Sequence, residues 1–401
     1  MDTSPLEFHA SARGPVRPGM KRAPTTGLIM TGGGARAAYQ VGVLKALSEI
    51  LPRHTRNPFP IICGTSAGAT NAVVLAAGAD NFRRAVRRLI AVWQNFRVEQ
   101  VYRADPLGAA RNSLRWIFTA LTGGAFSRTP VSLLDNSPLL ALLKRHLDFA
   151  AIARSIERAD LAAFSVTCSG YSSGQSVTFF QGCAGLQPWK RSRRVGIAMP
   201  ITLEHLVASS ALPFIFPPVH INREYFGDGS MRQIAPVSPA LHLGANRLLV
   251  IGVGRQLGGR AVERTLAQSS PSLAQIAGHA LNSIFLDTLE ADLERLQRIN
   301  RTLELIPGEV LQRTDYPLQK VEFRLISPSR DLEQIAVRYA DELPRTIKLL
   351  LATVGATGPG GANLLSYLLF EKSYCRTLIQ LGYEDTLARK EDLATFLACG
   401  C

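Results

Sequence analysis

Two segments of the chain decide its fold: GLIMTGGGAR at residues 27–36 and FPIICGTSAG at residues 59–68. Each is a short apolar run that ends in glycines, which is typical of a buried strand followed by a tight turn. Between them, apolar residues recur with helical spacing from Val41 to Ile50, and residues 67–77 are rich in Ala, Val and Leu. Strand, helix, strand and helix at these lengths predict an α/β fold with a mainly parallel sheet.

The second segment places Ser66 between Gly64 and Gly68. A G-x-S-x-G sequence between a strand and a helix is typical of a nucleophile elbow. The turn is tight, and glycine on both sides of the serine removes the clashes that larger residues would cause. The serine hydroxyl then projects above the sheet at a helix N-terminus, where backbone N–H groups stabilise negative charge. The alternative is a serine N-cap flanked by ordinary turn glycines.

The first segment places Gly32, Gly33 and Gly34 directly after the first strand. Consecutive glycines allow backbone N–H groups to turn toward one point. Two preorganised donors of this kind lower the energy of a developing oxyanion by roughly 3–4 kcal/mol each. We therefore expect an oxyanion hole at this loop, with Arg36 orienting the loop or adding positive charge.

A dinucleotide-binding loop is the rival interpretation, because Gly32, Gly34 and Ala37 also fit the pattern G-x-G-x-x-G/A. That pattern requires an acidic residue about 20 positions later, at the end of the next strand, to hold a ribose. The next strand ends in Cys63-Gly64-Thr65, which contains no acid. The dinucleotide-binding interpretation therefore lacks the acidic residue that would bind the ribose.

A third motif surrounds Asp228 in the sequence FGDGS at residues 226–230. An acid between two glycines is by default a turn. The segment ASSALP at residues 208–213 and the pair Pro217-Pro218 precede it and predict a shaped loop near the same end of the sheet.

The series GGGAR, GTSAG, ASSALPFIFPPV and DGS resembles the patatin-like phospholipases. The resemblance implies a three-layer α/β/α core and hydrolysis of acyl lipids without a cofactor or metal. It assigns the oxyanion hole to Gly32–Gly34 with Arg36 beside them, the nucleophile to Ser66 and the only base to Asp228. It does not identify the lipid headgroup, the acyl chain or an activating protein.

The resemblance covers roughly residues 26–255. It departs from the family pattern at Ala37, where glycine is usual, and at Ser230, where glycine or alanine is usual. We expect a disordered N-terminal lead at 1–25, a patatin-like catalytic domain at 26–260 and a mainly helical C-terminal region at 261–401. The last region carries no motif that we can assign.

A Ser–His–Asp triad is the competing enzyme hypothesis. Hydrolases with this elbow follow the chain order Ser, acid, His. Ser66, Asp228 and His242 satisfy that order. A lone histidine is more often a surface or core residue than a catalyst, so the two mechanisms stay open at this point.

The composition is that of a globular chain, with 46% hydrophobic residues among 401 and a formal net charge of +14. The six cysteines show no metal-ligand spacing, and we expect reduced thiols in a cytoplasmic protein. The first residues lack the apolar centre of a secretory signal, and no uninterrupted apolar window predicts a spanning helix.

The net positive charge favours anionic partners. Residues 83–128 contain nine arginines interleaved with Trp93, Phe96, Trp116 and Phe118, and residues 189–194 read WKRSRR. Arginine with tryptophan suits an anionic lipid interface, so we expect peripheral membrane contact. A basic nucleic-acid-binding protein is the non-enzyme alternative, but no nucleic-acid-binding motif supports it. We therefore expect no nucleic-acid partner.

Overall fold

The computed structural model describes residues 25–103, 132–255, 273–283, 287–307, 319–353 and 361–398. The predicted N-terminal lead, apart from its last residue, lies outside these ranges. So do Trp116, Phe118 and the glycine pair at 258 and 259, where the domain boundary is expected.

The described residues form one sheet of ten strands, in the order β10-β9-β1-β2-β3-β4-β6-β5, with β8 paired to β3 and β7 paired to β8. The strands are β1 (Thr26–Met30), β2 (Ile61–Thr65), β3 (Ala163–Gly170), β4 (Ser176–Gly182), β5 (Trp189–Arg191), β6 (Arg194–Ala198), β7 (Val219–Ile221), β8 (Glu224–Asp228), β9 (Arg247–Ile251) and β10 (Glu322–Ile326). Strands β10, β9, β1, β2 and β3 are mutually parallel, whereas β4 and β8 run antiparallel to β3.

The central parallel strands are buried along their whole length, because helices cover both faces of the sheet. In their register, Met30 lies opposite Gly64 on one side and Ile251 on the other. The carboxyl ends of β1, β2 and β9 therefore meet at one edge of the sheet. Both glycine motifs begin at that edge.

Alternate side chains of β1 enter different cores. Leu28 and Met30 belong to one apolar cluster and Ile29 to the other, as the two-residue period of a strand requires. Helices α1 (Ala38–Ile50), α2 (Ala67–Ala77), α3 (Phe82–Trp93) and α15 (Lys372–Leu387) contribute to the first cluster. Helices α8 (Ser238–His242) and α10 (Thr288–Glu304) contribute to the second. The predicted three-layer α/β/α fold is confirmed.

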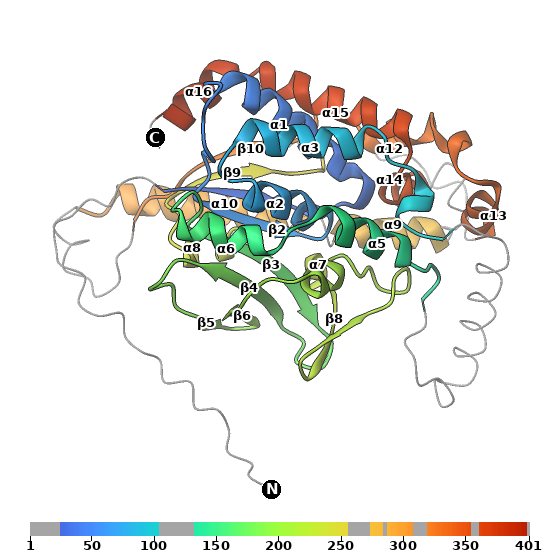
Figure 1. Cartoon of the computed structure of the whole chain (residues 1–401), viewed down its shortest axis with the longest axis horizontal. Helices are drawn as coiled ribbons and strands as arrows, with labels where there is room; N and C mark the ends of the chain where they lie inside the picture. Colours follow the sequence, from blue (N-terminus) through green and yellow to red (C-terminus); the bar gives the residue numbers. More distant parts are fainter. Residues whose placement is uncertain are drawn as a thin grey trace, which may run out of the picture.

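The C-terminal region shares this sheet and its larger core. Strand β10, which the sequence did not predict, extends the sheet beside β9. Helix α15 lies along α1, as Figure 1 shows, and glycines from both helices bring the two backbones together. The boundary expected near residue 260 therefore separates two segments of the chain that fold onto one another.

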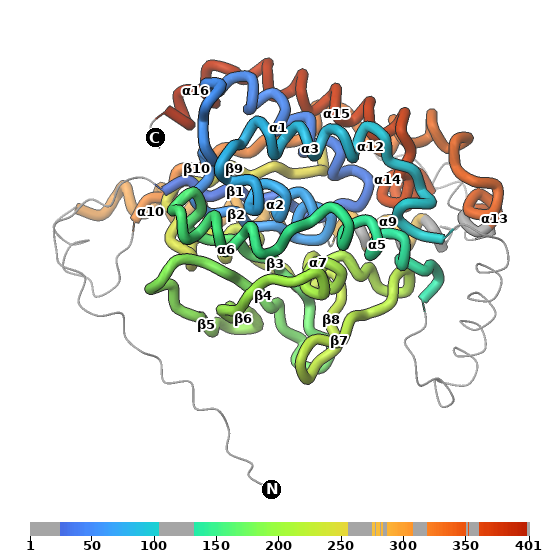
Figure 2. The backbone as a smooth tube through the Cα atoms, viewed as in Figure 1, coloured from blue at the N-terminus to red at the C-terminus, as the bar shows by residue number. Residues whose placement is uncertain are grey.

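The other helices complete the layers and the edges of the sheet. They are α5 (Ser137–His146), α6 (Ala150–Glu157), α7 (Leu203–Ser209), α9 (Leu273–Asn282), α12 (Leu332–Val337), α13 (Arg345–Thr353), α14 (Ala362–Leu368) and α16 (Lys390–Ala398). Helices α14 and α16 lie toward opposite ends of the molecule (Figure 2). Helix α14 abuts the carboxyl edge of the sheet through a contact with Gly34, whereas α16 contacts Arg247 at the opposite edge.

The aromatic rings expected at a membrane surface are buried wherever the structure describes them. Trp93 packs against Phe96 and Phe370, with ring centroids 5.0 and 6.3 Å away. Trp189 is stacked between Phe180 and His242. The prediction that these tryptophans reach lipid headgroups is wrong, because the core contacts already enclose their rings.

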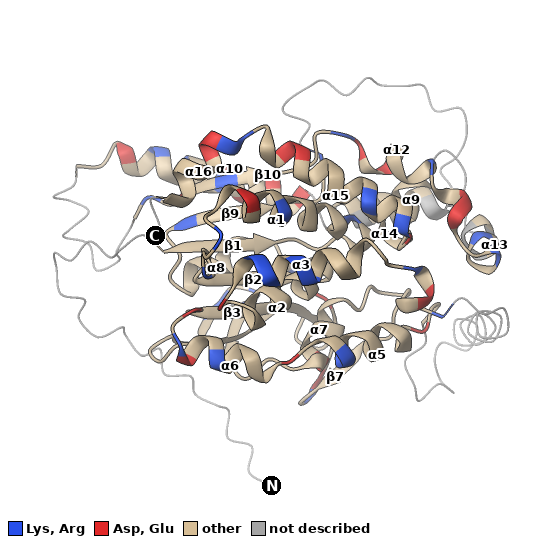
Figure 3. Ribbon diagram, turned by 45° about the horizontal axis from the view of Figure 1, so that its top comes forward, with Lys and Arg blue, Asp and Glu red and all other residues tan. Residues whose placement is uncertain are grey.

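Several of the arginines that the sequence predicts at a membrane surface are exposed. Arg84, Arg87 and Arg88 of α3 are exposed, and Figure 3 shows basic residues along this helix.

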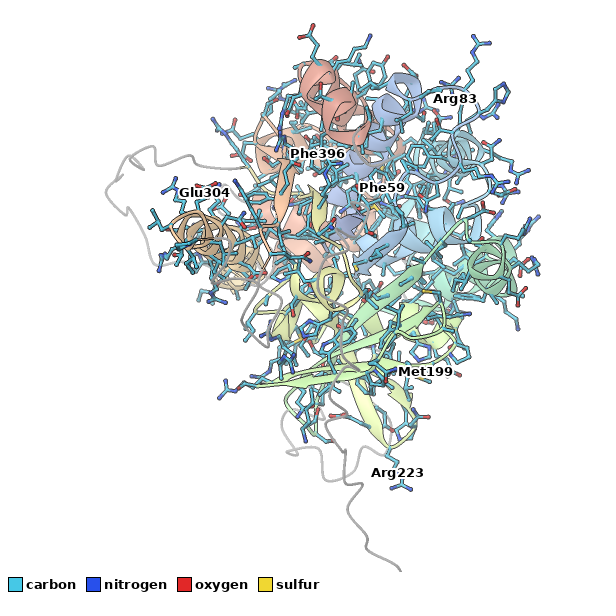
Figure 4. All side chains as sticks on the ribbon, turned by 90° about the vertical axis from the view of Figure 1, so that its left-hand side faces the viewer. Phe59, Arg83, Met199, Arg223, Glu304 and Phe396 are labelled. Carbon is cyan, nitrogen blue, oxygen red and sulfur yellow. The ribbon has the colours of Figure 1, made fainter. Side chains whose placement is uncertain are left out.

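Arg223 points outward from the turn of the β7–β8 hairpin, whereas Phe59 lies in the interior (Figure 4). No helix of the described residues combines the length and apolarity needed to span a bilayer.

The close contact of α1 and α15 yields a stability prediction. A Cβ atom added at Gly382 would lie 2.2 Å from the backbone oxygen of Tyr39, so the helices would have to separate. We expect Gly382→Ala to lower the free energy of unfolding by roughly 1–3 kcal/mol, despite the higher helix propensity of alanine. Denaturant unfolding measures the change.

The matched control is Gly252→Ala, since a Cβ atom there would approach no atom closer than 3.5 Å. This control should stay near wild-type stability. A Gly382→Ala protein as stable as wild type would contradict the packing described for α1 and α15.

Candidate active site

Ser66 occupies a strained turn between β2 and α2. Its backbone has φ 54° and ψ −131°, a conformation that costs a non-glycine residue about 1–3 kcal/mol. The flanking glycines permit this turn. A Cβ atom at Gly64 would lie 2.5 Å from Cα of Ala69, and one at Gly68 would lie 2.4 Å from the oxygen of Met30.

The contact of Gly68 also brings the serine turn against the end of β1. A Cβ atom there would meet the carbonyl oxygens of both Met30 and Thr31, the residues that lead into the glycine loop. The first turn of α2 and the glycine loop are therefore in backbone contact. The parallel register of β1 and β2 places the two motifs at the same sheet edge, and this contact makes them adjacent.

The glycine loop is held by its neighbours and keeps its amides free. Gly34 has φ +54°, and a Cβ atom at Gly33 would lie 2.4 Å from Cγ2 of Val253. Gln40 Nε2 donates a hydrogen bond to the oxygen of Thr31 at 2.7 Å. Among the described residues, the N–H groups of Gly32, Gly33 and Gly34 donate no recorded hydrogen bond. They are available to a ligand atom.

A buried chain of polar side chains extends from this loop into the core. Gln40 Oε1 accepts from Asn71 Nδ2 at 3.0 Å, and Asn71 Oδ1 accepts from the Trp93 indole at 2.8 Å. Trp93 thus holds Asn71 and, through it, Gln40, the side chain that supports the glycine loop. Sequence analysis missed this role because nothing local distinguishes a core tryptophan from an interfacial one.

Asp228 ends β8 and is fully buried. Its backbone N–H donates to Ala211 at 2.9 Å, and its Oδ1 accepts from the N–H of Ser230 at 2.9 Å. Its other oxygen, Oδ2, is buried and has no hydrogen-bond partner among the described residues. This carboxylate oxygen is therefore free to accept a proton.

Burial raises the pKa of Asp228 from 3.8 to about 6. The Ser66 hydroxyl and the Ser230 groups oppose this rise, because donors this close to the carboxyl favour its charged form. The serine is thus close enough to influence the carboxyl, although no hydrogen bond of standard geometry joins them. Such contacts are often long before substrate binds.

Ser209 connects the elbow to the neighbouring strand. Its hydroxyl accepts from the N–H of Ser66 at 2.8 Å and donates to the oxygen of Thr167 at 2.6 Å. The N–H of Ser66 is therefore occupied. The sequence marked residues 208–213 as a shaped loop, but the role of this serine depends on contacts that only the folded chain makes.

His242, the histidine of the triad hypothesis, makes its contacts away from Ser66 and Asp228. His242 Nδ1 lies within hydrogen-bond distance of Ser238, and the His242 ring stacks on Trp189 in the second apolar cluster. His205 is buried against Phe179, and its Nδ1 accepts from the N–H of Thr202. Burial lowers the pKa of His205 to about 4. Neither ring hydrogen-bonds to Ser66 or Asp228 in the described structure.

Arg36 follows the glycine loop in the 3-10 helix η1 (Gly34–Ala37), but its guanidinium turns toward the C-terminal helices. The side chain is only 2% exposed. The expectation that Arg36 adds its charge to an oxyanion is at odds with this placement, because polar groups of the C-terminal region already enclose that charge.

The described residues contain no cluster of three or more His, Cys, Asp or Glu side chains suited to a metal ion. The sheet edge brings together a serine on a strained turn, a buried carboxyl and a glycine loop. One carboxyl oxygen and the loop amides have no hydrogen-bond partner among the residues that the structure describes. This set of groups is suited to acyl transfer.

The fold and this arrangement define a three-layer α/β protein with a serine at a tight turn between a strand and a helix. The family model "Patatin-like phospholipase" matches residues 28–241, more than half of the chain. The chain belongs to the patatin-like phospholipase family.

Individual relatives are more distant. A lysophospholipase nte1 of Aspergillus terreus is 48% identical over 56 residues, which are 14% of this chain and 3% of that protein. Human GIVD cytosolic phospholipase A2 aligns over 94% of this chain and 60% of its own, with 12% identity and a TM-score of 0.43. VipD from Legionella pneumophila aligns over 92% and 67%, with 13% identity and a TM-score of 0.33.

From the raised pKa of Asp228 we predict how the free energy of unfolding depends on pH. Because the pKa in the folded state exceeds the unfolded value of 3.8, the ionised carboxylate destabilises the fold. The ionised carboxylate lowers the free energy of unfolding fully above about pH 6, and this loss vanishes below about pH 4. Since each pKa unit corresponds to about 1.4 kcal/mol, the cost near neutrality is about 3 kcal/mol.

We expect Asp228→Asn to raise the free energy of unfolding near pH 7.5 and to change it little near pH 4. Urea unfolding at both pH values measures the difference. The same change at the exposed Asp341 should have little effect at either pH. A gain that is equal at the two pH values would disprove the destabilisation of the ionised carboxylate by burial.

Proposed function

We propose that the protein is a serine acyl hydrolase that cleaves ester bonds of phospholipids, lysophospholipids or related acyl lipids through a Ser66–Asp228 dyad. The observation that carries the proposal is the pairing of the strained Ser66 turn with the fully buried Asp228 carboxyl, whose Oδ2 has no hydrogen-bond partner within the described part of the chain. Family membership supports lipid as the substrate class.

In the first half-reaction, Asp228 Oδ2 accepts the hydroxyl proton as Ser66 Oγ attacks the acyl carbonyl carbon. Burial supports this role, because a pKa near 6 makes the carboxylate a better base than an exposed aspartate. The N–H groups of Gly32–Gly34 stabilise the oxyanion. The ester C–O bond then breaks, and the leaving alcohol takes the proton from Asp228.

In the second half-reaction, a water molecule gives a proton to Asp228 and attacks the acyl-enzyme. The C–Oγ bond breaks, Ser66 recovers the proton, and the fatty acid leaves. No cofactor enters either step. The strain at Ser66 is offset by the close backbone contacts of its neighbouring glycines.

Membrane contact at the mouth of this site belongs to the proposal. Phe214 is 71% exposed at φ +66°, and Ile234 is 53% exposed. Phe214 lies three residues after Ala211, and Ile234 directly follows Gln233. Ala211 accepts a hydrogen bond from the N–H of Asp228, and Gln233 Oε1 accepts one from the hydroxyl of Thr65, the residue before Ser66.

We infer that these two exposed side chains meet lipid as an apolar rim, and that the exposed Arg232, which lies between them in sequence, binds anionic headgroups. The Phe214 backbone is held in its strained conformation by the N–H of Leu133, which donates to its oxygen at 2.8 Å. An exposed aromatic residue kept in strained backbone favours a surface function. We further propose a cytoplasmic location, which the buried unpaired Cys63, Cys168 and Cys375 support.

Fluorophosphonate labelling tests the dyad. We expect Ser66→Ala to abolish labelling and ester hydrolysis, and Asp228→Asn to lower kcat by at least about 10³-fold. His242→Ala should stay within about threefold of wild type, because this ring packs in the second core. Labelling that persists in Ser66→Ala would refute the nucleophile, and a loss of several orders of magnitude in His242→Ala would instead establish a triad.

Vesicle sedimentation tests the rim. We expect the double change Phe214→Ser and Ile234→Ser to weaken binding to anionic vesicles about tenfold or more, because two apolar side chains lose their burial in lipid. Hydrolysis of a monomeric short-chain ester should not change. Leu305→Ser, at an 84% exposed residue that follows α10, is the matched control. Equal wild-type binding to neutral and anionic vesicles without salt dependence would rule out the anionic interface.

A further inference from the structure

Three helices of the C-terminal region surround the guanidinium of Arg36. Its Nε donates to Ser366 Oγ at 2.8 Å, and its Nη2 donates to Asn363 Oδ1 at 2.9 Å and Glu333 Oε1 at 3.2 Å. We call the five groups around the guanidinium the cradle: Asn282 of α9, Glu333 of α12, and Asn363, Ser366 and Tyr367 of α14.

The cradle is itself cross-linked. Asn282 Nδ2 donates to Glu333 Oε1 at 3.0 Å, and the Tyr367 hydroxyl donates to Asn282 Oδ1 at 3.1 Å. The Tyr367 ring also lies under Arg36, with its centroid 4.0 Å from Cζ. Three helices are thus fixed to one another around a single cation.

The glycine loop touches the same helix through its backbone. A Cβ atom at Gly34 would lie 2.3 Å from the oxygen of Tyr367, so only glycine allows this approach. Arg36 follows two residues later, and its N–H donates to the oxygen of Gly33 at 3.1 Å. The loop is therefore joined to α14 both by a backbone contact and by the Arg36 side chain.

From this geometry we propose that Arg36 is a positioning residue that fixes the oxyanion loop by anchoring it to the cradle, so that α9, α12 and α14 complete the catalytic site. The inference rests on the proposed function. Arg36 does not touch the substrate, because its side chain is 2% exposed and its donors are already engaged. The C-terminal region acquires a role in catalysis that none of its own motifs indicates.

The energetics favour a rigid anchor. A buried cation that loses part of its hydrogen-bonding partners is strongly destabilised, so the cradle admits few arrangements. Glu333 supplies the compensating charge, and the remaining acceptors satisfy the planar donors of the guanidinium. Because the amides of the loop act only when correctly aimed, a displacement of about 1 Å costs up to about 100-fold in rate.

The experiment measures kcat and KM of Arg36→Met and Ser366→Ala on two substrates, a neutral short-chain p-nitrophenyl ester and a monomeric lysophospholipid. We expect Arg36→Met to lower kcat by about 10- to 100-fold on both, with KM changed less than about twofold. Ser366→Ala removes one acceptor and should lower kcat by a smaller factor, about 3- to 10-fold. Rates are expressed per folded enzyme.

The matched control is Arg247→Met. Arg247 is also buried and stacks on an aromatic ring of the C-terminal region, Phe396, but it lies at the start of β9, at the opposite sheet edge. We expect this variant to lose stability and to keep its kcat. Arg36→Lys provides a second test if Arg36→Met does not fold, since it keeps the charge but not the planar donors. It should fall between wild type and Arg36→Met.

Hydrogen–deuterium exchange gives a readout that does not depend on activity. Exchange of the Arg36 amide, which donates to the oxygen of Gly33, should rise in Arg36→Met and Ser366→Ala but not in Arg247→Met. If wild type shows no Ser66-dependent hydrolysis, the proposed function fails, and the exchange data still decide whether Arg36 anchors the loop.

Two results would overturn the inference. A loss confined to the lysophospholipid would make Arg36 a direct phosphate ligand. Unchanged kcat and unchanged loop exchange in a less stable Arg36→Met protein would make the cradle merely structural.

Discussion

Two backbone turns at the carboxyl edge of the sheet touch so closely that no side chain fits between them. The absence of a side chain at Gly68 lets the first turn of α2 rest against the carbonyl oxygens of Met30 and Thr31. Because β1 and β2 are parallel and in register, this contact fixes the serine turn relative to the glycine loop. The remaining layers hold these two turns at this separation.

The carboxyl of Asp228 shows the opposite balance, since it is a local source of instability. Burial favours its neutral form, and one oxygen is left without a partner. A protein selected for stability alone would pair or expose such a group. Under the proposed mechanism, the same burial increases the proton affinity that a base needs. Stability and the proposed chemistry therefore make opposite demands on one side chain.

The C-terminal region links this site to the rest of the molecule. It contributes a strand to the sheet, a helix packed on α1 and the polar groups that enclose Arg36. The contact between α1 and α15 uses a glycine on each side, Gly42 and Gly382, so the helices approach at the level of their backbones. A segment without a recognisable motif thus provides much of the rigidity around the glycine loop.

The sequence by itself determined the layers of the core, the order of its first strands and helices, and the residues of the two glycine motifs. These follow from apolar periodicity and glycine spacing, which act over a few residues. The burial of Trp93, the direction of the Arg36 side chain and the existence of β10 were decided only by the tertiary structure. Arg36 and Ser366 are 330 residues apart in the chain. No local pattern can specify such a partner, because the packing of distant segments determines which groups meet.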